Sequence, residues 1–293
     1  MRDNDFRDAI LSAGLTPPDY IEPGRLYRFP GQGKRRKNRA GWCLLFPDGK
    51  GGIFGDWSTG YTETWQAQRH RPMTAAERAN FERLVKAAKA KARAEQAARY
   101  DEAAERAQAI WDKAKPAPAG HPYLVRKRIK PHTARLHRAS LVLPVVDFTG
   151  RLVSLQFIKP DGSKLLLSGG RKRGCFIPVD GDLEQPERAI VCEGWGTGCT
   201  LAEDEPAALV LAAIDAGNLK PVALSARQRW PNTELVIAGD DDRRTPGNPG
   251  RTKALEAARA VGCLVAFPEW PKDAPEALTD FNDLAAWQAG GAV

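Results

Sequence analysis

Metal-binding patterns of cysteine and histidine are missing from this sequence. Its five cysteines include no C-x-x-C pair, and none of its four histidines stands at metal-ligand spacing from a cysteine. A zinc ribbon or a dithiol redox motif would need such spacings, so we expect neither, and no bound zinc. The odd number of cysteines and the apolar surroundings of several predict buried, reduced thiols, as in a cytoplasmic protein.

Long hydrophobic runs are missing as well. No apolar stretch approaches the roughly 20 residues that a membrane-spanning helix needs, and the opening MRDNDFRDAI lacks the pattern of a signal peptide. We expect a cytoplasmic chain with no membrane partner. The sequence also contains no G-x-x-x-x-G-K-[ST] loop, so we expect any helicase that works with it to be a separate protein.

Positive charge is in excess. The chain has 44 Lys and Arg against 36 Asp and Glu, a net charge of +8. This balance favours a polyanionic partner such as nucleic acid. Many cytoplasmic proteins are basic, however, so charge alone leaves the partner open.

Residues 1–73 are expected to form a small basic, aromatic region rich in β-strands. Segments 41–46 and 52–57 flank the turn-rich PDGKGG and predict two paired strands. A basic loop, GKRRKNR, precedes them among several aromatic residues. The loop is either a solvated surface or a contact for nucleic-acid phosphates, with bases stacked on the rings. The candidate contacts here are Lys34, Arg35, Arg36 and Trp42.

Residues 74–115 predict one long connector helix. Thr74 and Glu77 have the spacing of a capping box, and the interior is rich in Ala, Glu, Lys and Arg. Large apolar side chains are nearly confined to the two ends, so we expect a helix docked at both ends and exposed between them. The KPAPAG sequence that follows breaks the helix and predicts a domain boundary near residue 116.

Residues 116–185 predict an antiparallel region. Apolar runs at 140–146, 151–158 and 164–167 are separated by DFTG and KPDG, which are typical of hairpin turns. The sequence GGRKRG then places three positive charges between glycines. That segment is either a phosphate contact or a mobile turn, and its candidates are Arg171, Lys172 and Arg173.

Residues 186–293 change to an α/β pattern. Four short apolar strands alternate with helical segments; the strands lie near 189–193, 207–213, 234–239 and 263–267. This alternation predicts βαβ units with a mainly parallel, Rossmann-like sheet covered by helices on both faces.

Carboxylates gather where two of these strands end. Glu193 follows the first strand, and Asp240, Asp241 and Asp242 follow the third. Functional groups of open α/β sheets gather at this carboxyl edge. Two carboxylates about 4 Å apart repel by roughly 4 kcal/mol at an effective dielectric of 20, so water, arginines or a divalent cation must offset the repulsion.

Two interpretations of this cluster are open. Glu193, Asp240 and Asp242 form an all-oxygen donor set suited to Mg²⁺ or Mn²⁺, ions that serve phosphoryl transfer. In the second interpretation the cluster is structural and is neutralised by nearby arginines, namely Arg243, Arg244 and Arg251. We favour the metal, because a nucleic-acid site also needs arginines beside its acids.

The order of these motifs resembles a known domain. CEGWGTG, followed about 45 residues later by AGDDDRRTPGNPG, is similar to the Toprim domain shared by bacterial primases, topoisomerases and some nucleases. That domain has a glutamate after its first strand and a D-x-D after a later one, positions matched by Glu193, Asp240 and Asp242. The resemblance implies that Glu193 acts in catalysis and that the two aspartates bind the metal.

The resemblance extends along nearly the whole chain. YRFPGQGKRRKNRAGW, HPYLVRKRIKPH and TDFNDLAAW are similar to primases of phages and conjugative plasmids. It implies that Asp280 or Asp283 completes the acidic site, although a helix N-cap suits Asp283 equally. Many such primases begin with a zinc module that senses the template; we expect the basic, aromatic N-terminal region to take that role, or the protein to be a specialised primase. Our further candidates for nucleotide or template phosphates are Arg126, Arg128, Arg171, Lys172, Arg173, Arg243 and Arg251.

The residues alone predict a metal-dependent phosphoryl-transfer protein that acts on nucleic acid, and the resemblance implies that it is a DNA primase. It would join ribonucleoside triphosphates into short RNA primers on a single-stranded DNA template with Mg²⁺ or Mn²⁺, and a separate replicative helicase is a further expected partner. A metal-dependent nuclease with the same carboxylates is an alternative, because a metal site does not set the direction of the reaction. A non-catalytic single-stranded DNA-binding accessory protein is the third possibility.

Overall fold

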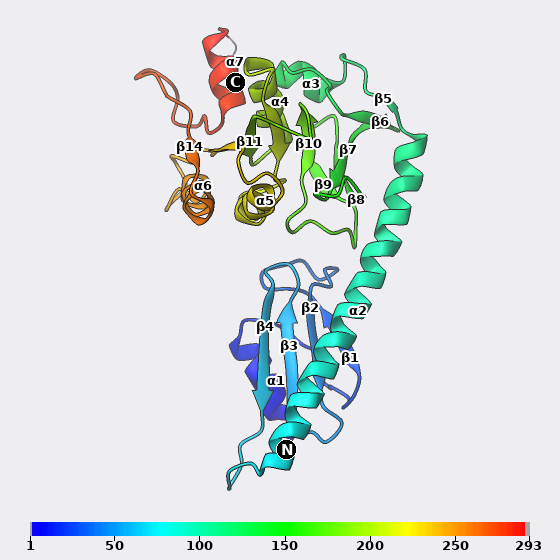
Figure 1. Cartoon of the computed structure of the whole chain (residues 1–293). Helices are drawn as coiled ribbons and strands as arrows, with labels where there is room; N and C mark the ends of the chain where they lie inside the picture. The colour runs from blue at the N-terminus through cyan, green and yellow to red at the C-terminus, as the bar shows by residue number, and fades with distance from the viewer. Residues whose placement is uncertain (1, 291–293) are drawn as a thin grey trace. The chain divides into compact units, whose positions relative to one another are not determined.

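In the computed structural model, which describes residues 2–290, the chain forms two units, Met1–Ala98 and Arg99–Val293 (Figure 1). The boundary falls inside helix α2 (Ala75–Lys113). The segments expected from the sequence, 1–73, 74–115, 116–185 and 186–293, stay predictions. None of the described helices is both long and apolar enough to cross a membrane.

The first unit is an antiparallel sheet between two helices. Its strands pair in the order β1-β2-β3-β4, with bounds Leu26–Phe29, Gly41–Leu45, Gly51–Asp56 and Tyr61–Gln66. Because successive side chains alternate between faces, Cys43 and Leu45 pack with α1 (Arg2–Ser12), while Trp42 and Leu44 pack with α2. The predicted hairpin is confirmed as β2–β3, and β1 and β4 extend it on either side.

Helix α2 begins at the predicted capping box. The Glu77 N–H donates to Thr74 Oγ1 at 3.2 Å, and the Thr74 N–H donates to Glu77 Oε2 at 2.9 Å. Alanines provide much of the packing surface: Ala88 and Ala92 pack in the first unit, and Ala107 packs in the second against β7 and β8. Docking at both ends is thus confirmed, and the alanines add to the contacts of the large apolar residues at the two ends of the helix, Phe81, Leu84, Val85, Ile110 and Trp111.

The second unit begins with an antiparallel sheet of order β5-β6-β7-β8-β9. Its strands are Lys115–Pro116, Arg135–His137, Ser140–Val146, Leu152–Ile158 and Lys164–Leu166, with α3 (Pro122–Lys127) between the first two. The three predicted strands are confirmed as β7, β8 and β9.

The second sheet of this unit has the order β10-β12-β11-β13-β14. Only β10 is antiparallel to its neighbour; the other pairs are parallel, as expected. The strands are Ile177–Asp180 (β10), Arg188–Cys192 (β11), Leu209–Ala212 (β12), Glu234–Ala238 (β13) and Leu264–Ala266 (β14).

Helices cover both faces of this mixed sheet. Alternate strand residues such as Ile190 and Cys192 pack with α4, and Ala189 and Val191 pack with α5 and α6. These helices are Trp195–Asp204 (α4), Ala216–Arg229 (α5) and Pro249–Val261 (α6), followed by Phe281–Gln288 (α7). All five cysteines are free thiols; four are buried and Cys263 is partly exposed.

The alanine packing of α2 yields a first prediction. Ala107 is fully buried against β7 and β8, so Ala107→Leu overpacks this contact and lowers the free energy of unfolding by about 1–3 kcal/mol. Ala97→Leu, on the exposed side of the same helix, changes it by less than about 0.5 kcal/mol. Urea unfolding of the two variants measures the difference; equal losses would contradict the packing.

Candidate active site at the carboxyl edge of the mixed sheet

Parallel pairing places the predicted carboxylates at one edge. Cys192 at the end of β11 lies opposite Ala238 at the end of β13, and also opposite Ala212 at the end of β12. Glu193 therefore leaves the sheet beside the Gly239–Asp240 segment, and Asp215, the residue at the N-cap position of α5, follows β12 at the same edge. The sequence prediction of a shared edge is confirmed for the strands that carry these residues.

Glu193 is partly buried in a negative environment. Burial raises its pKa, and the charges of Asp242 and Asp215 raise it further. The backbone N–H of Ala216, at the start of α5, and the charge of Lys164 oppose this rise. Glu193 is thus held at a helix N-terminus, where a carboxylate is stabilised, while neighbouring carboxylates favour its protonation.

Asp240 is the carboxylate of the cluster whose ionised form is the most strongly disfavoured. Burial, followed by the charges of Glu193, Asp280 and Asp242, raises the pKa of Asp240 to about 8. Its Oδ1 atom is buried and has no hydrogen-bond partner among the described residues. An enclosed carboxylate oxygen without a partner is costly, and a bound cation would offset that cost.

Asp242 and Asp280 each also accept a hydrogen bond from the first turn of a helix. Asp242 Oδ2 accepts from the Gly250 N–H at 2.8 Å, in the first turn of α6. Asp280 Oδ1 accepts from the Asp283 N–H at 2.8 Å and is the N-cap of α7. Both carboxylates keep a second oxygen, so these hydrogen bonds leave each with capacity for another ligand.

Asp241, the middle aspartate, has a different role. It is buried, and its Oδ1 accepts from Asn248 Nδ2 at 2.7 Å while its Oδ2 accepts from Trp270 Nε1 at 3.1 Å. Arg251 forms an ion pair with it at 3.5 Å. Arginine neutralisation therefore applies to Asp241, whereas neither Asp240 nor Asp242 has an arginine ion pair in the described part of the chain.

The NPG sequence shapes the loop between β13 and α6. Asn248, at a positive φ of 40°, is the N-cap of α6; its Oδ1 accepts from the Asp242 and Arg251 N–H groups. A Cβ on Gly250 would lie 2.8 Å from the Asp240 carbonyl oxygen and 2.9 Å from Asp242 Oδ2. Only glycine thus allows α6 to approach the aspartates so closely. The order Asn-Pro-Gly is a helix-start signal that could have identified Asn248.

Lys164 is a site residue that sequence reasoning missed. It lies on β9 of the antiparallel sheet, and its Nζ would be 3.7 Å from a Cβ on Gly194, directly after Glu193. Its positive charge lowers the pKa of both Glu193 and Asp240. No motif marks Lys164, because its position depends on the packing of one sheet against another.

The donor set suits a divalent metal in its chemistry. Carboxylate oxygens are the ligands that Mg²⁺ and Mn²⁺ prefer, and the unpartnered Asp240 Oδ1 provides a free donor. The side chains do not yet converge, however: among residues 2–290 no three His, Cys, Asp or Glu side chains are arranged to hold one ion. A bound metal would therefore require rotation of these carboxylates.

Several predicted phosphate contacts already have protein partners. Arg171 forms an ion pair with Asp147 at 3.0 Å, and Lys172 forms one with Asp215. Arg243 donates to the carbonyl oxygens of Pro275 and Leu278 and lies over Trp270, while Arg251 pairs with Asp241. These contacts fix the loops around the site, and Arg173 is exposed beside them.

Arg126 and Arg128 are exposed, at the end of α3. Arg126 Nη1 donates to the Pro160 carbonyl at 3.1 Å, and Arg128 has the positive φ of a helix C-cap. Asp283 pairs with Lys127 at 3.0 Å and accepts from the Thr279 N–H. The charge of Asp280 is one of those that raise the pKa of Asp240.

In the first unit, Lys34, Arg35 and Arg36 are exposed on the loop between β1 and β2. Trp42 is only 3% exposed and stacks on Trp57 with ring centroids 5.3 Å apart. Its ring has no accessible face for a base, because Trp42 lies under α2 in the core. We therefore leave Trp42 out of the proposed contacts.

The stretch of chain that carries this site matches a known domain family. Residues 188–292, from β11 to beyond α7, match the Toprim domain family. The C-terminal part of the chain therefore matches this family, as its glutamate and D-x-D pattern predicted.

The similarity to particular proteins extends beyond that domain. Over 93% of its length the chain is 35% identical to a DNA primase TraC of Escherichia coli, and over 94% it is 31% identical to a second E. coli DNA primase TraC. It spans 28% and 20% of the lengths of these relatives. The predicted resemblance to Toprim-domain primases is thus confirmed. Among solved structures, the primase fragment of the bacteriophage T7 primase-helicase protein is 14% identical, with a TM-score of 0.42 over 90% of this chain and 95% of that one.

The environment of Asp240 predicts that the free energy of unfolding falls as the pH rises. Its pKa is raised from an ordinary value near 4 to about 8, so folding favours its protonated form. The resulting loss of stability is absent below pH 4, grows as the pH rises to 8, and is complete above it. In chelator, Asp240→Asn should therefore be more stable than wild type at pH 8.5, with the difference vanishing near pH 4. Thermal unfolding across this range measures it.

The matched control for this effect is Asp241→Asn. This substitution removes the ion pair with Arg251, and an amide side chain, with a single oxygen, cannot replace the two carboxylate oxygens that accept hydrogen bonds from Asn248 and Trp270. This variant should lose about 1–3 kcal/mol of stability. Destabilisation of Asp240→Asn at pH 8.5, to the same extent as Asp241→Asn, would contradict the account of the cluster.

Proposed function

We propose that the protein is a DNA primase that joins ribonucleoside triphosphates into short RNA primers on single-stranded DNA. The observation that carries this proposal is Asp240, with an unpartnered buried oxygen and a pKa of about 8 among the charges of three other carboxylates. A divalent cation is a ligand that would relieve this repulsion. Similarity over 93% of the chain to a curated DNA primase supports nucleotidyl transfer as the reaction.

The carboxylates have separate roles in this proposal. Glu193, Asp240 and Asp242 would hold Mg²⁺ or Mn²⁺, which when bound neutralises charge that develops on the transferred phosphoryl group. Glu193, with its raised pKa, is suited to take the proton of the attacking 3′-hydroxyl. Asp280 stays at the α7 N-terminus and adds negative charge to the site.

Positive side chains complete the proposed site. Lys164, beside Gly194, is placed to contact the phosphates of an incoming nucleotide. Template phosphates would contact exposed basic residues, in the second unit and on the β1–β2 loop: Arg126, Arg128, Arg173, Lys34, Arg35 and Arg36. Single-stranded DNA, ribonucleoside triphosphates and a separate replicative helicase are the partners that this function implies.

The direct test is primer synthesis on single-stranded DNA with labelled ribonucleotides and Mg²⁺ or Mn²⁺. Wild type should make short metal-dependent products, and Asp240→Ala with Asp242→Ala should reduce them at least about a hundredfold, because a catalytic metal contributes several kcal/mol. The matched control removes two exposed carboxylates outside the site, Asp273→Ala with Glu276→Ala, and should keep full activity. Degradation of the template by wild type would indicate a nuclease instead, and binding without either reaction an accessory protein.

Lys164 gives an independent prediction. Lys164→Ala should raise the KM for ribonucleotides roughly tenfold, because it removes a charge-assisted contact to phosphate of about 1.4 kcal/mol or more. Lys159→Ala, at an exposed lysine in the turn before β9, should leave the KM unchanged. Steady-state kinetics at saturating template separates the two, and an unchanged KM in Lys164→Ala would remove Lys164 from the site.

A further inference from the structure

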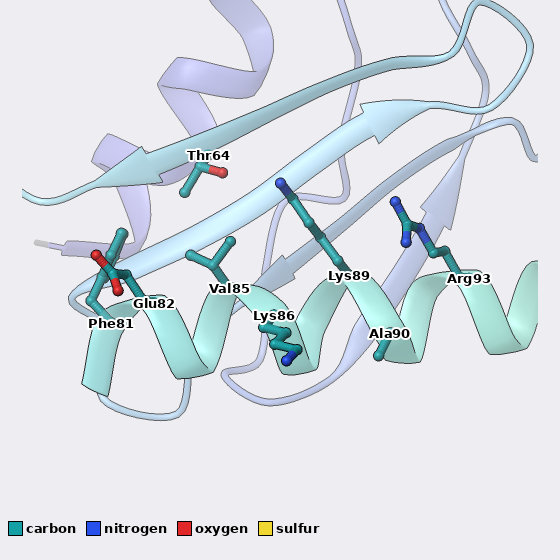
Figure 2. A pocket seen from close by; sticks show the side chains of 8 residues that line it. All are labelled: Thr64, Phe81, Glu82, Val85, Lys86, Lys89, Ala90 and Arg93. Atoms are coloured by element: carbon teal, nitrogen blue, oxygen red, sulfur yellow. The ribbon is translucent and has the colours of Figure 1, made fainter. Parts of the chain in front are cut away.

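A groove with a volume of about 550 Å³ lies within the first unit, whereas the carboxylate cluster belongs to the second unit. One side is α2 and the other is β4, from which Thr64 lines the groove (Figure 2). Phe81 and Val85 give it an apolar floor, and Lys86, Lys89 and Arg93 supply positive charge. In Figure 2, Lys89 and Arg93 extend from α2 toward the strands.

The groove follows from how α2 crosses the sheet. Ala88 and Ala92 pack against the residues of β2 and β3, including Ile53. Thr64 pairs with Ile53, so it faces the same side of the sheet, yet β4 is an edge strand whose residues are mostly exposed. The helix therefore leaves the β4 side of this face open, with hydroxyl and apolar groups along it.

The charge of the chain is concentrated in this unit. Residues 1–98 contain 18 Lys and Arg against 11 Asp and Glu, so they hold +7 of the net charge of +8. Between Arg78 and Arg93, α2 has six basic residues and a single acid, Glu82. Lys86, Lys89 and Arg93 are exposed and make no hydrogen bond or ion pair with any other described residue. Three unpaired cations beside one apolar groove are complementary to a polyanion.

We propose that this groove binds single-stranded DNA. The three cations follow one another along the helix axis at intervals of about 4.5 and 6 Å, from a rise of 1.5 Å per residue, and contact successive phosphates. Phe81 and Val85 receive base faces, which only an unpaired strand exposes. Glu82 repels phosphate at the Phe81 end, so the backbone lies along the Lys86–Arg93 part. The choice of DNA among polyanions rests on the proposed primase function.

The test measures binding of full-length protein to a fluorescent oligo-dT without nucleotides or metal. The groove variant is Lys86→Gln, Lys89→Gln and Arg93→Gln, and glutamine preserves helix propensity. The matched control removes three other exposed charges: Lys50→Gln, Arg83→Gln and Lys113→Gln. Loss of three phosphate contacts reduces the slope of log K against log salt by about 2 and weakens binding on the order of a hundredfold at 0.1 M salt. The control should keep the wild-type slope.

Photocross-linking supplies a second measurement on the unaltered protein. An oligonucleotide with bromodeoxyuridine should cross-link within residues 81–93. Equal salt slopes in the two variants, or cross-links confined to other parts of the chain, would overturn the proposal that the groove binds single-stranded DNA. Cross-links to α2 in a protein that makes no primers support the groove and contradict the proposed function. Primer synthesis without those cross-links overturns the groove alone.

Discussion

Repulsion between carboxylates at one sheet edge is the constraint on which the rest of the site depends. Parallel pairing of β11 with β13 places Glu193 beside Asp240, and α7 brings the charge of Asp280 to the same place. Burial and these charges raise the pKa of Asp240 to about 8, and its Oδ1 has no partner in the described part of the chain. The fold accepts an unfavourable local arrangement that a divalent cation would make favourable.

The surrounding structure holds this arrangement through neutral and paired contacts. Asn248 caps α6 and binds both Asp241 and the Asp242 N–H, while Trp270 and Arg251 satisfy Asp241. The three consecutive aspartates therefore have different roles. Asp241 holds the loop through its hydrogen bonds and ion pair, and Asp240 and Asp242 each keep an oxygen that can bind a ligand. On the opposite sheet Lys164 offsets part of the negative charge without forming an ion pair with either Glu193 or Asp240 in the described residues.

Much of this could be predicted from the sequence, because it depends on local patterns. The alternation of strands and helices predicted the four parallel strands of the mixed sheet, although not its antiparallel strand β10, and the order of Glu193 and the D-x-D predicted that the cluster lies at its carboxyl edge. Features set by tertiary packing were beyond reach. Nothing in the sequence distinguishes Asp241 from its two neighbours. The sequence also does not indicate that Lys164, from another sheet, lies near Glu193, or that α2 covers Trp42. The large apolar residues at the two ends of α2 predicted that both ends dock, but the sequence did not indicate which alanines are buried in these contacts.

The most direct test of the central claim is the position of Mn²⁺ in crystals of the protein, located by anomalous scattering. We expect one ion at the carboxyl edge, bound by Asp240 and at least one of Glu193 and Asp242, with Asp241 still paired to Asn248 and Arg251. An edge without manganese at saturating concentration, with Asp240 Oδ1 satisfied by an arginine or by water, would contradict the account.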